Sequence, residues 1–283
     1  MQKSILIPTD FSTNAFNAVL YAFELYNKTE CIFHVYHTYY ISASAIGNPL
    51  FPVPDSREYV EAEKQVKAKM NAWKEQVNKI VNPNIHKVYF EYEYGFLVDR
   101  LKTKVEKEKI DLIIMGTRGS TDDDSVVYGQ NTIDVMEKVR NCPVLGIPKH
   151  VDFKKLNEIV FPTDFKGNWN TKELNVLLHI LEITNSELSI LHIGNEFDLD
   201  ETQVENKIKL QELFKSCEPS FHWMQNVSPE DGLLLFAKQR KSGMIAFVNR
   251  KHRFFSSIFS NPLIIKLGLQ TTEPLLALHD NPS

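Results

Sequence analysis

The chain has 283 residues, of which 43% are hydrophobic and 24% charged, and its formal net charge is −4. The length suits two domains of ordinary size, and the absence of a basic excess argues against nucleic-acid binding. Three scattered cysteines fit a reducing compartment, and we find neither a secretory signal nor an apolar run long enough to span a membrane. We therefore expect a cytoplasmic protein without a membrane segment.

The first 148 residues alternate between apolar runs and segments with helical spacing. The runs 5–7, 31–36, 87–95, 111–115 and 143–148 predict strands, and the segments 14–26, 56–80, 96–107 and 132–139 predict helices. A segment with one glycine and three prolines, 41–55, predicts a loop. Strands that alternate with helices predict a doubly wound, open parallel sheet of the Rossmann-like α/β class. In such sheets the ligand lies at the carboxyl ends of the strands.

One of these strands runs into a set of glycines. Gly116 ends the run at 112–115, and Gly119 and Gly129 follow with the spacing G-x2-G-x9-G before a predicted helix. Glycine lets backbone N–H groups approach an anion, and a helix start offers unpaired donors, so this stretch is a candidate phosphate cradle. The spacing is neither that of the Walker loop nor that of the dinucleotide fingerprint. No motif positions a base or a nucleophile, and we assign no catalytic residue.

The pattern of the first half returns in the second. Segment 159–165 restates 5–11, segment 188–193 restates the strand around His34, segment 244–249 stands in place of 112–116, and 274–278 in place of 143–147. A period of half the chain indicates a duplication, with domains at 1–148 and 156–283 joined by a polar linker at 149–155. We expect the final strands of the two domains to pack together as an intramolecular pseudo-dimer, which would hide two sheet edges.

The glycine spacing and the duplication together resemble the universal stress protein family in its tandem form, over nearly the whole chain. This resemblance implies an adenine nucleotide alpha-hydrolase-like fold and a regulatory role in the stress response. It also implies binding of ATP or AMP, with or without Mg²⁺, an unidentified protein partner, and a pseudo-dimer or homodimer. Gln130 departs from the family pattern, in which Ser or Thr follows the third glycine; Asn131 or Thr132 offers a donor from the same turn.

The resemblance also implies a set of nucleotide contacts, including the backbone of Val35 against adenine. The set is Pro8, Thr9, Asp10, Val35, Met115, Gly116, Arg118, Gly119, Gly129, Gln130, Asn131 and Thr132. For some members another interpretation stays open. Asp10, Ser12 or Thr13 could cap the helix that follows, and Met115 could simply fill the core. Arg118 is equally well explained as a phosphate contact or as a solvated loop residue.

The second half departs from the pattern where the cradle should lie. Segment 249–262 contains no glycine, so we expect no nucleotide there; the basic run 250–253 is better explained as a solvated loop than as an anion site. In the first half, the acidic run 122–124 either faces water or holds Mg²⁺. Two functions remain open, a nucleotide-binding stress module and an interaction module of the same fold that binds no nucleotide. A slow ATPase is a third, weaker alternative.

Overall fold

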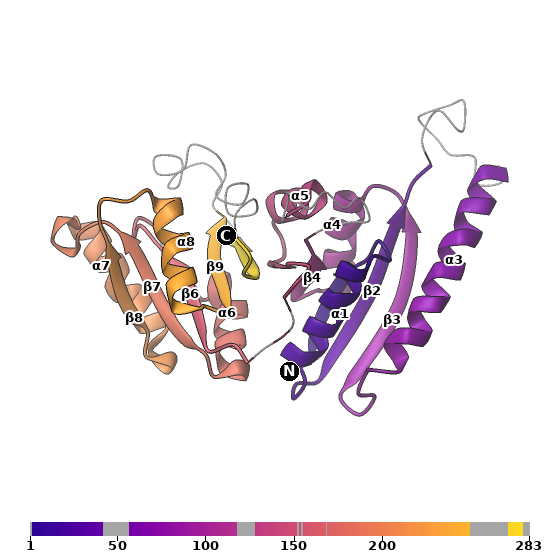
Figure 1. Ribbon diagram of the computed structural model, residues 1–283, viewed down its shortest axis with the longest axis horizontal. Helices are drawn as coiled ribbons and strands as arrows, with labels where there is room; N and C mark the ends of the chain where they lie inside the picture. The colour runs from indigo at the N-terminus through magenta and orange to yellow at the C-terminus, as the bar shows by residue number, and fades with distance from the viewer. Residues whose placement is uncertain are drawn as a thin grey trace.

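The computed structural model describes residues 2–41, 57–117, 128–151, 153, 155–167, 169–249 and 271–279. Within these residues the chain forms two α/β halves that lie side by side and share one sheet (Figure 1). Four of the sequence predictions fall outside the described residues: the loop predicted at 41–55, except for residue 41, the pair Arg118 and Gly119, the acidic run 122–124 and the basic run 250–253.

The first half alternates strands and helices in the predicted order. Its elements are β1 (Lys3–Pro8), α1 (Thr13–Leu25), β2 (Cys31–Tyr39), α3 (Arg57–Asn78), β3 (His86–Tyr94), α4 (Leu97–Glu108), β4 (Leu112–Gly116), α5 (Gln130–Lys138) and β5 (Val144–Ile147). Periodicity explains the helices. On α3, for example, the buried residues are Val66, Met70, Trp73 and Val77, three to four positions apart, so one face of a polar helix packs on the sheet.

The second half contains one strand that the sequence did not reveal. Its elements are β6 (Glu158–Pro162), α6 (Thr171–Thr184), β7 (Glu187–Ile193), η1 (Glu196–Asp198), α7 (Glu201–Leu213), η2 (Lys215–Cys217), β8 (Ser220–Met224), α8 (Pro229–Arg240), β9 (Met244–Asn249) and β10 (Leu275–His279). The strand β8 was missed because it lies at the edge of the sheet, where most of its residues are only half-buried, and it carries no continuous apolar run.

All ten strands belong to one sheet with the order β3-β2-β1-β4-β5-β10-β9-β6-β7-β8. Strands within each half are parallel, whereas β5 and β10 are antiparallel, with Leu145 opposite Leu276. The predicted contact between the two final strands is therefore present, as a continuous ladder. Only β3 and β8 remain as edges of the described sheet.

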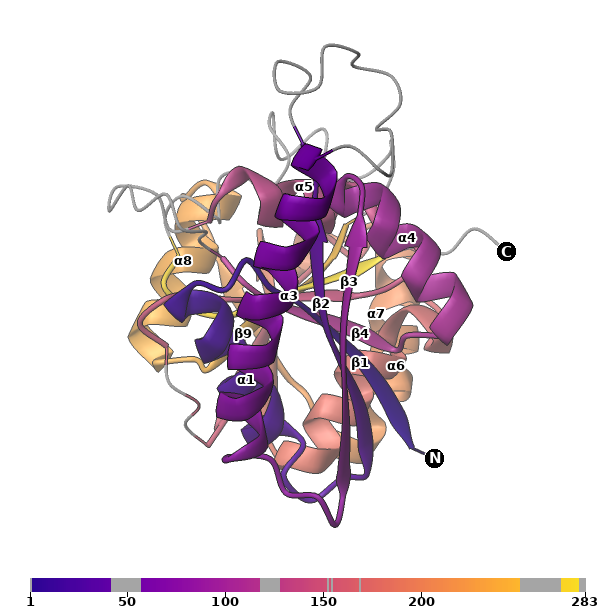
Figure 2. The same ribbon diagram turned by 90° about the vertical axis from the view of Figure 1, so that its right-hand side faces the viewer.

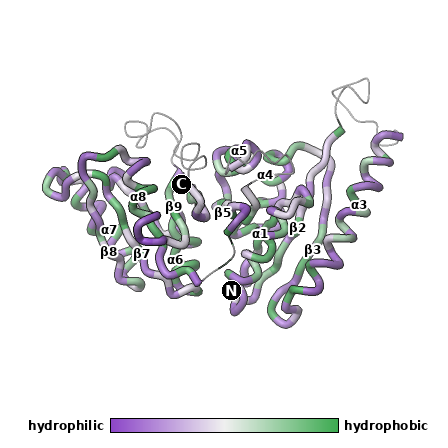
Figure 3. Tube along the Cα trace, viewed as in Figure 1, coloured by the Kyte–Doolittle hydropathy of each residue, from purple (hydrophilic) through white to green (hydrophobic). Residues whose placement is uncertain are grey.

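Helices cover both faces of this sheet. Buried residues of α1, α3, α6 and α7 pack with one set of strand residues, and those of α4, α5 and α8 pack with the alternate set. Figure 2 shows α1 and α4 on opposite sides of the strands of the first half. In Figure 3 apolar residues follow the strands, while the outer helix α3 is largely hydrophilic. This is the three-layer arrangement that alternating strands and helices predict.

The strand register corrects one detail of the predicted repeat. In both halves the proline that ends the first strand pairs with the residue just before a histidine of the second strand, which is His37 in one half and His192 in the other. His192 is therefore the counterpart of His37 and not of His34. The sequence suggested His34 because it precedes an apolar residue, Val35, as His192 does, whereas His37 precedes a threonine.

The helix α5 links the two halves on one face of the sheet. Just before it, the buried Tyr128 hydroxyl lies 3.3 Å from the Glu273 carbonyl oxygen of the second half. At its other end, the Asn249 amide donates to the Met136 carbonyl oxygen at 3.2 Å, and the Arg140 guanidinium donates to the Asn249 carbonyl oxygen. The two ends of α5 are thus held by the last residue of β9 and by Glu273, just before β10.

Candidate functional site

A cavity of about 530 Å³ opens at the carboxyl ends of β1, β2 and β4, beside the start of α5. Nine of the predicted contacts line it: Pro8, Thr9, Asp10, Met115, Gly116, Gly129, Gln130, Asn131 and Thr132. The remaining lining residues that the structure describes are Ala15, His37, Thr38, Tyr40, Gly95, Phe96, Leu97 and Thr117. Residues from five separate segments of the chain therefore converge at the place where parallel sheets bind ligands.

The wall at the end of β1 is a tight turn. The Thr9 hydroxyl accepts from Phe11 N–H at 2.9 Å, and the Asp10 carboxylate accepts from Ser12 N–H at 3.0 Å. Phe11 has a φ of 66°, which places it in the left-handed region. Ser12, not Asp10, is the N-cap of α1, because its hydroxyl accepts from Ala15 N–H at 3.1 Å. Asp10 is exposed and lines the cavity, so capping does not account for it.

The wall at the end of β2 is held by His37. Its Nδ1 lies 2.6 Å from the Thr9 carbonyl oxygen, and because a carbonyl only accepts, Nδ1 carries the proton. Burial lowers the pKa of His37, with partial compensation from the Thr9 carbonyl, so the ring is neutral near pH 7. The predicted contact Val35 does not line the cavity; it is fully buried in the middle of β2, between Ile7 and Phe90.

The wall at the end of β4 depends on the absence of a side chain. A Cβ added to Gly116 would lie 2.8 Å from the carbonyl oxygen of Asn14, so glycine lets α1 pack directly against the strand end. The buried Thr132 hydroxyl donates to the Gly116 carbonyl oxygen at 3.1 Å. Thr132 therefore fixes the first turn of α5 against β4, and the glycine serves packing as well as access to the cavity.

The N-terminus of α5 lines the cavity and has no side-chain cap. Its N-cap is Gly129, which has no side chain to cap the helix, and the first turn carries no acidic residue. Gln130 lines the cavity, but its amide nitrogen donates along the helix to the Asp134 carboxylate at 2.8 Å. A helix N-terminus offers backbone donors and a favourable dipole to an anion.

Charge in the cavity is sparse. Among its described lining residues Asp10 is the only carboxylate, and there is no lysine or arginine. Among all the residues that the structure describes, no group of three or more His, Cys, Asp or Glu side chains is arranged to hold a metal ion. Within the described wall, an anionic ligand would thus rely on neutral donors, which are backbone N–H groups and polar side chains such as Asn131.

The second half repeats the β1 turn but closes it. Asp164 accepts from Lys166 N–H at 2.9 Å, and His192 Nδ1 lies 2.8 Å from the Thr163 carbonyl oxygen, as at Asp10 and His37. However, Asp164 is only 5% exposed, and Gln203 of α7 donates to its carbonyl oxygen at 2.7 Å. By register, Gly116 corresponds to the buried Val248, so a side chain now occupies the strand end.

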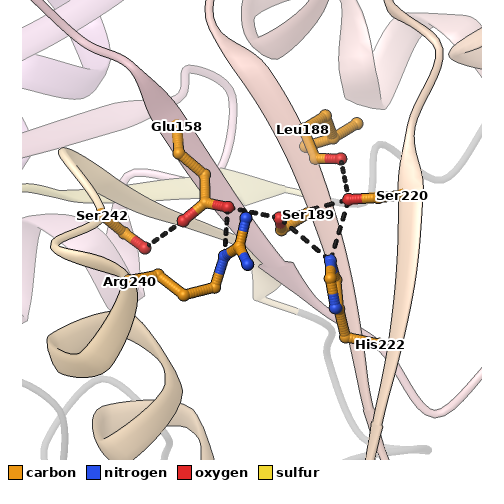
Figure 4. Close-up of polar contacts among 7 residues, drawn as sticks. All are labelled: Glu158, Leu188, Ser189, Ser220, His222, Arg240 and Ser242. Atoms are coloured by element: carbon orange, nitrogen blue, oxygen red, sulfur yellow. Dashed lines mark hydrogen bonds and ion pairs between the residues drawn. The ribbon is translucent and has the colours of Figure 1, made fainter.

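A second polar cluster lies at the opposite end of the strands of the second half (Figure 4). Glu158, at the start of β6, accepts hydrogen bonds from Ser189, Ser242 and Arg240, and these bonds lower its pKa despite burial. His222 Nε2 lies 2.9 Å from the Ser220 hydroxyl. No carboxylate contacts His222 within this drawn cluster, so it lacks the orientation of a Ser-His-Asp triad. We interpret the cluster as a buried carboxylate whose hydrogen bonds are satisfied.

Sequence reasoning missed the lining residues at the carboxyl ends of β2 and β3. They are His37, Thr38, Tyr40, Gly95, Phe96 and Leu97. For the first two a signal existed: aligning His192 with His37, rather than with His34, would have moved the predicted adenine contact from Val35 to Thr38. The others belong to no motif in the sequence.

Of the helices that the structure describes, none is both long and apolar enough to cross a membrane.

Comparisons with known proteins agree with this architecture. Residues 1–148 match the sequence model of the Universal stress protein family. A universal stress protein of Methanocaldococcus jannaschii is 26% identical over 149 residues, which are 53% of this chain and 84% of the relative. A universal stress protein of Archaeoglobus fulgidus has a TM-score of 0.70 at 16% identity, over 97% of both chains. A functionally unknown protein of Pseudomonas aeruginosa has a TM-score of 0.60 at 12% identity, over 98% of this chain and 92% of its own. The two structures share the fold across both halves.

Proposed function

The chain belongs to the universal stress protein family, and from this premise we propose that its first half binds an adenine nucleotide, ATP or AMP, in the cavity beside α5. Family membership supports a role in the stress response. In our proposal the protein is a cytoplasmic regulatory module, and nucleotide occupancy changes its affinity for a protein partner.

The observation that carries the proposal is the junction of β4 with α5. A strand end without a side chain, Gly116, and a helix N-cap without a side chain, Gly129, line the same cavity. This combination brings backbone donors close to a ligand and adds the dipole of α5, which suits a phosphate group. We assign the phosphates to this end, with Asn131 as a neighbouring polar contact; the buried Thr132 hydroxyl already donates to the Gly116 carbonyl oxygen. Gly119 and Arg118 complete the cradle in the proposal by family resemblance.

The adenosine moiety belongs at the other end of the cavity. The register aligns His37 with His192, so Thr38 is the counterpart of Ile193. We therefore assign to Thr38 the backbone contact with adenine that the sequence had suggested for Val35. Asp10 is exposed and next to β2, where its carboxylate can accept from a ribose hydroxyl or from the base. Met115 lies beside Gly116 at the cavity wall and would contact the base.

We propose that the second half, residues 156–283, serves as a scaffold that binds no nucleotide, joined by the linker 149–155 to the binding half 1–148. Val248 fills the position of Gly116, and α7 covers the turn at Asp164. These two changes remove the access that a phosphate and a ribose would need. The ladder between β5 and β10 then takes the place of a contact between two separate chains.

One observation favours the alternative of an interaction module that binds no nucleotide. The described lining contains a carboxylate, Asp10, and no lysine or arginine, which disfavours a triphosphate unless a cation accompanies it. The same observation favours AMP over ATP in the absence of Mg²⁺, because AMP carries less charge. A slow ATPase would need a base near the phosphates, and none of the described lining residues beside α5 is titratable.

The test is isothermal titration of the full chain with ATP and with AMP, each with and without Mg²⁺. We expect about one nucleotide per chain, with Mg²⁺ improving ATP binding more than AMP binding. A stoichiometry near two would contradict the proposal that the second half binds no nucleotide. The absence of binding under all four conditions would favour the interaction module. Val248→Ala, in the second half, is the control variant and should titrate like the wild type.

A further inference from the structure

Two large aromatic side chains stand exposed at the rim of the same cavity. Tyr40, just beyond β2, is 63% exposed, and Phe96, between β3 and α4, is 67% exposed. Their ring centroids are 5.5 Å apart with the planes tilted by 39°, and both residues line the cavity. Exposed aromatic rings gain little from the fold, so a pair of them at a cavity entrance calls for another explanation.

The backbone places Phe96 in this position at a local cost. Gly95 has a φ of 143° and donates its N–H to the Tyr39 carbonyl oxygen at 2.9 Å, which holds the turn after β3 against the end of β2. Phe96 then occupies the N-cap of α4, where it makes no capping hydrogen bond. Ser, Thr, Asp and Asn are the residues that stabilise this position, so phenylalanine leaves the start of α4 without a side-chain cap. Departures from a local rule tend to mark functional positions.

The second half supplies an internal comparison. By strand register, Tyr40 corresponds to Asn195 and Phe96 to Val227. The helix that follows, α8, begins with an ordinary cap, since the Ser228 hydroxyl accepts from Asp231 N–H at 3.1 Å. The aromatic pair is therefore confined to the half that has the glycine-lined helix start, which is the correlation expected if both serve one ligand.

The order of the strands places the two features at opposite ends of one cavity. In the sequence β3-β2-β1-β4 the aromatic pair follows β3 and β2, whereas the anion-binding end follows β4. A ligand that spans the cavity thus meets aromatic rings at one end and the N-terminus of α5 at the other. A nucleotide has this form, with a flat base at one end and phosphate at the other.

We propose that Tyr40 and Phe96 form a stacking platform for the purine base, and that this platform determines the preference for nucleotides over other phosphorylated ligands. The inference rests on the proposed function for the identity of the ligand. The flat face of a base stacks on an aromatic ring whatever its hydrogen-bonding edge, so the platform contributes affinity for purines in general. Selection of adenine would then come from the end of β2 and from Asp10.

Phe96→Ser is the most informative variant, because it removes the ring and restores a standard N-cap. Stability should be equal to or above that of the wild type, so a loss of binding cannot be attributed to unfolding. Tyr40→Asn introduces the residue of the second half, and Phe197→Ala, which removes a 93% exposed ring far along the chain, is the control. We expect each rim variant to bind ATP and adenosine roughly 5- to 100-fold more weakly, and the control to be unchanged.

Adenosine and inorganic phosphate separate this proposal from the proposed function. Ligand-observed NMR titrations with adenosine, which has no phosphate, report on the platform, and titrations with inorganic phosphate report on the cradle. If adenosine binds the wild type and is weakened by both rim variants while phosphate is unaffected, the platform is supported, even if ATP fails to bind. If adenosine binds the wild type and the double rim variant equally, or does not bind the wild type, the platform is overturned, whatever the result with ATP.

Discussion

The two halves of this protein share a topology and a turn, but the turn of the first half lines a cavity whereas the turn of the second half is buried. The Thr-Asp-Phe turn after β1 recurs after β6 with the same hydrogen bonds and the same left-handed phenylalanine. Asp10 is exposed at a cavity, whereas its counterpart Asp164 is buried under α7. The turn is therefore a structural feature of the fold, and what distinguishes the two halves is the space around it.

The most direct test of this comparison is to replace Gly116 of the first half with valine, the residue that the second half has at the same position. Gly116→Val places a side chain where a Cβ would already lie 2.8 Å from the Asn14 carbonyl oxygen. We expect nucleotide binding to be lost and the free energy of unfolding to fall by about 1–3 kcal/mol, as for other overpacked cores. Titration calorimetry and thermal denaturation measure the two effects.

The matched change in the second half is Val248→Ala, which should lower stability by about 1–3 kcal/mol without altering nucleotide binding. If Gly116→Val still binds nucleotide with wild-type affinity, the difference between the halves does not reside at this strand end.

The junction between the halves provides a second test, through pH. Burial, and then the nearby Arg140, lowers the pKa of His279 to about 3. The unfolded chain binds a proton near pH 6.5 while the folded chain does not, so stability falls as the pH drops below about 6.5. At pH 5 the loss should reach about 2 kcal/mol from this one residue.

His279→Gln should remove that share of the acid sensitivity, which denaturant unfolding between pH 5 and pH 7.5 would measure. Arg140→Gln, which leaves the histidine but removes the repulsion, should reduce the sensitivity only in part. If the wild type and His279→Gln lose stability in parallel over this range, the buried histidine is not its source.

A third test compares the two aspartates directly. Asp10→Asn should weaken nucleotide binding by about 10-fold, the loss expected for one hydrogen bond to a charged acceptor, with little change in stability. Asp164→Asn should leave binding unchanged. Burial raises the pKa of Asp164, so the folded state disfavours its charged form, and the contribution of Asp164 to wild-type stability should decrease as the pH rises above about 3.8.

The neutral asparagine at position 164 should abolish that decrease and leave the protein at least as stable as the wild type at pH 7. Calorimetric titration and unfolding of both variants, side by side, provide the measurement. Equal effects of the two substitutions on nucleotide affinity would contradict the assignment of a single binding half.

The smallest effect concerns the connection of α5 to the second half. Tyr128→Phe removes a buried hydroxyl that lies 3.1 Å from the Gly146 carbonyl oxygen and 3.3 Å from that of Glu273. We expect a loss of about 0.5–1.5 kcal/mol in the free energy of unfolding, with nucleotide affinity within a factor of two or three of the wild type. A large loss of affinity would instead show that this hydroxyl sets the position of Gly129.

The sequence was most informative where apolar runs were long. Strands β1, β2, β4 and β5 were predicted because they are buried on both faces, and the duplication predicted the pairing of β5 with β10. The edge strand β8 was missed because edge residues need not be apolar. The register of β2 was misread because two histidines, His34 and His37, lie three residues apart on one strand, and only the pairing with β1 distinguishes them.

For the candidate site too, the sequence predicted residues that belong to a local pattern and missed those that only the fold brings together. Residues adjacent in the chain to the glycine spacing or to the end of β1 were predicted, since one motif names them together. Tyr40 and Phe96 are separated by more than fifty residues and meet only because β2 and β3 are neighbours in the sheet. The burial of Asp164 likewise depends on a helix, α7, whose position over the turn no local pattern encodes.

The antiparallel ladder between β5 and β10 has a consequence for the synthesis of this protein. When Ile147 has left the ribosome, its strand has no partner on the outer side until Leu275 arrives about 130 residues later. At typical translation rates this interval lasts roughly 6 to 26 s. During that time an apolar strand with open hydrogen-bonding groups is available to any other nascent chain. Slow translation should therefore lower the yield of soluble protein more than the stability of the finished fold would suggest.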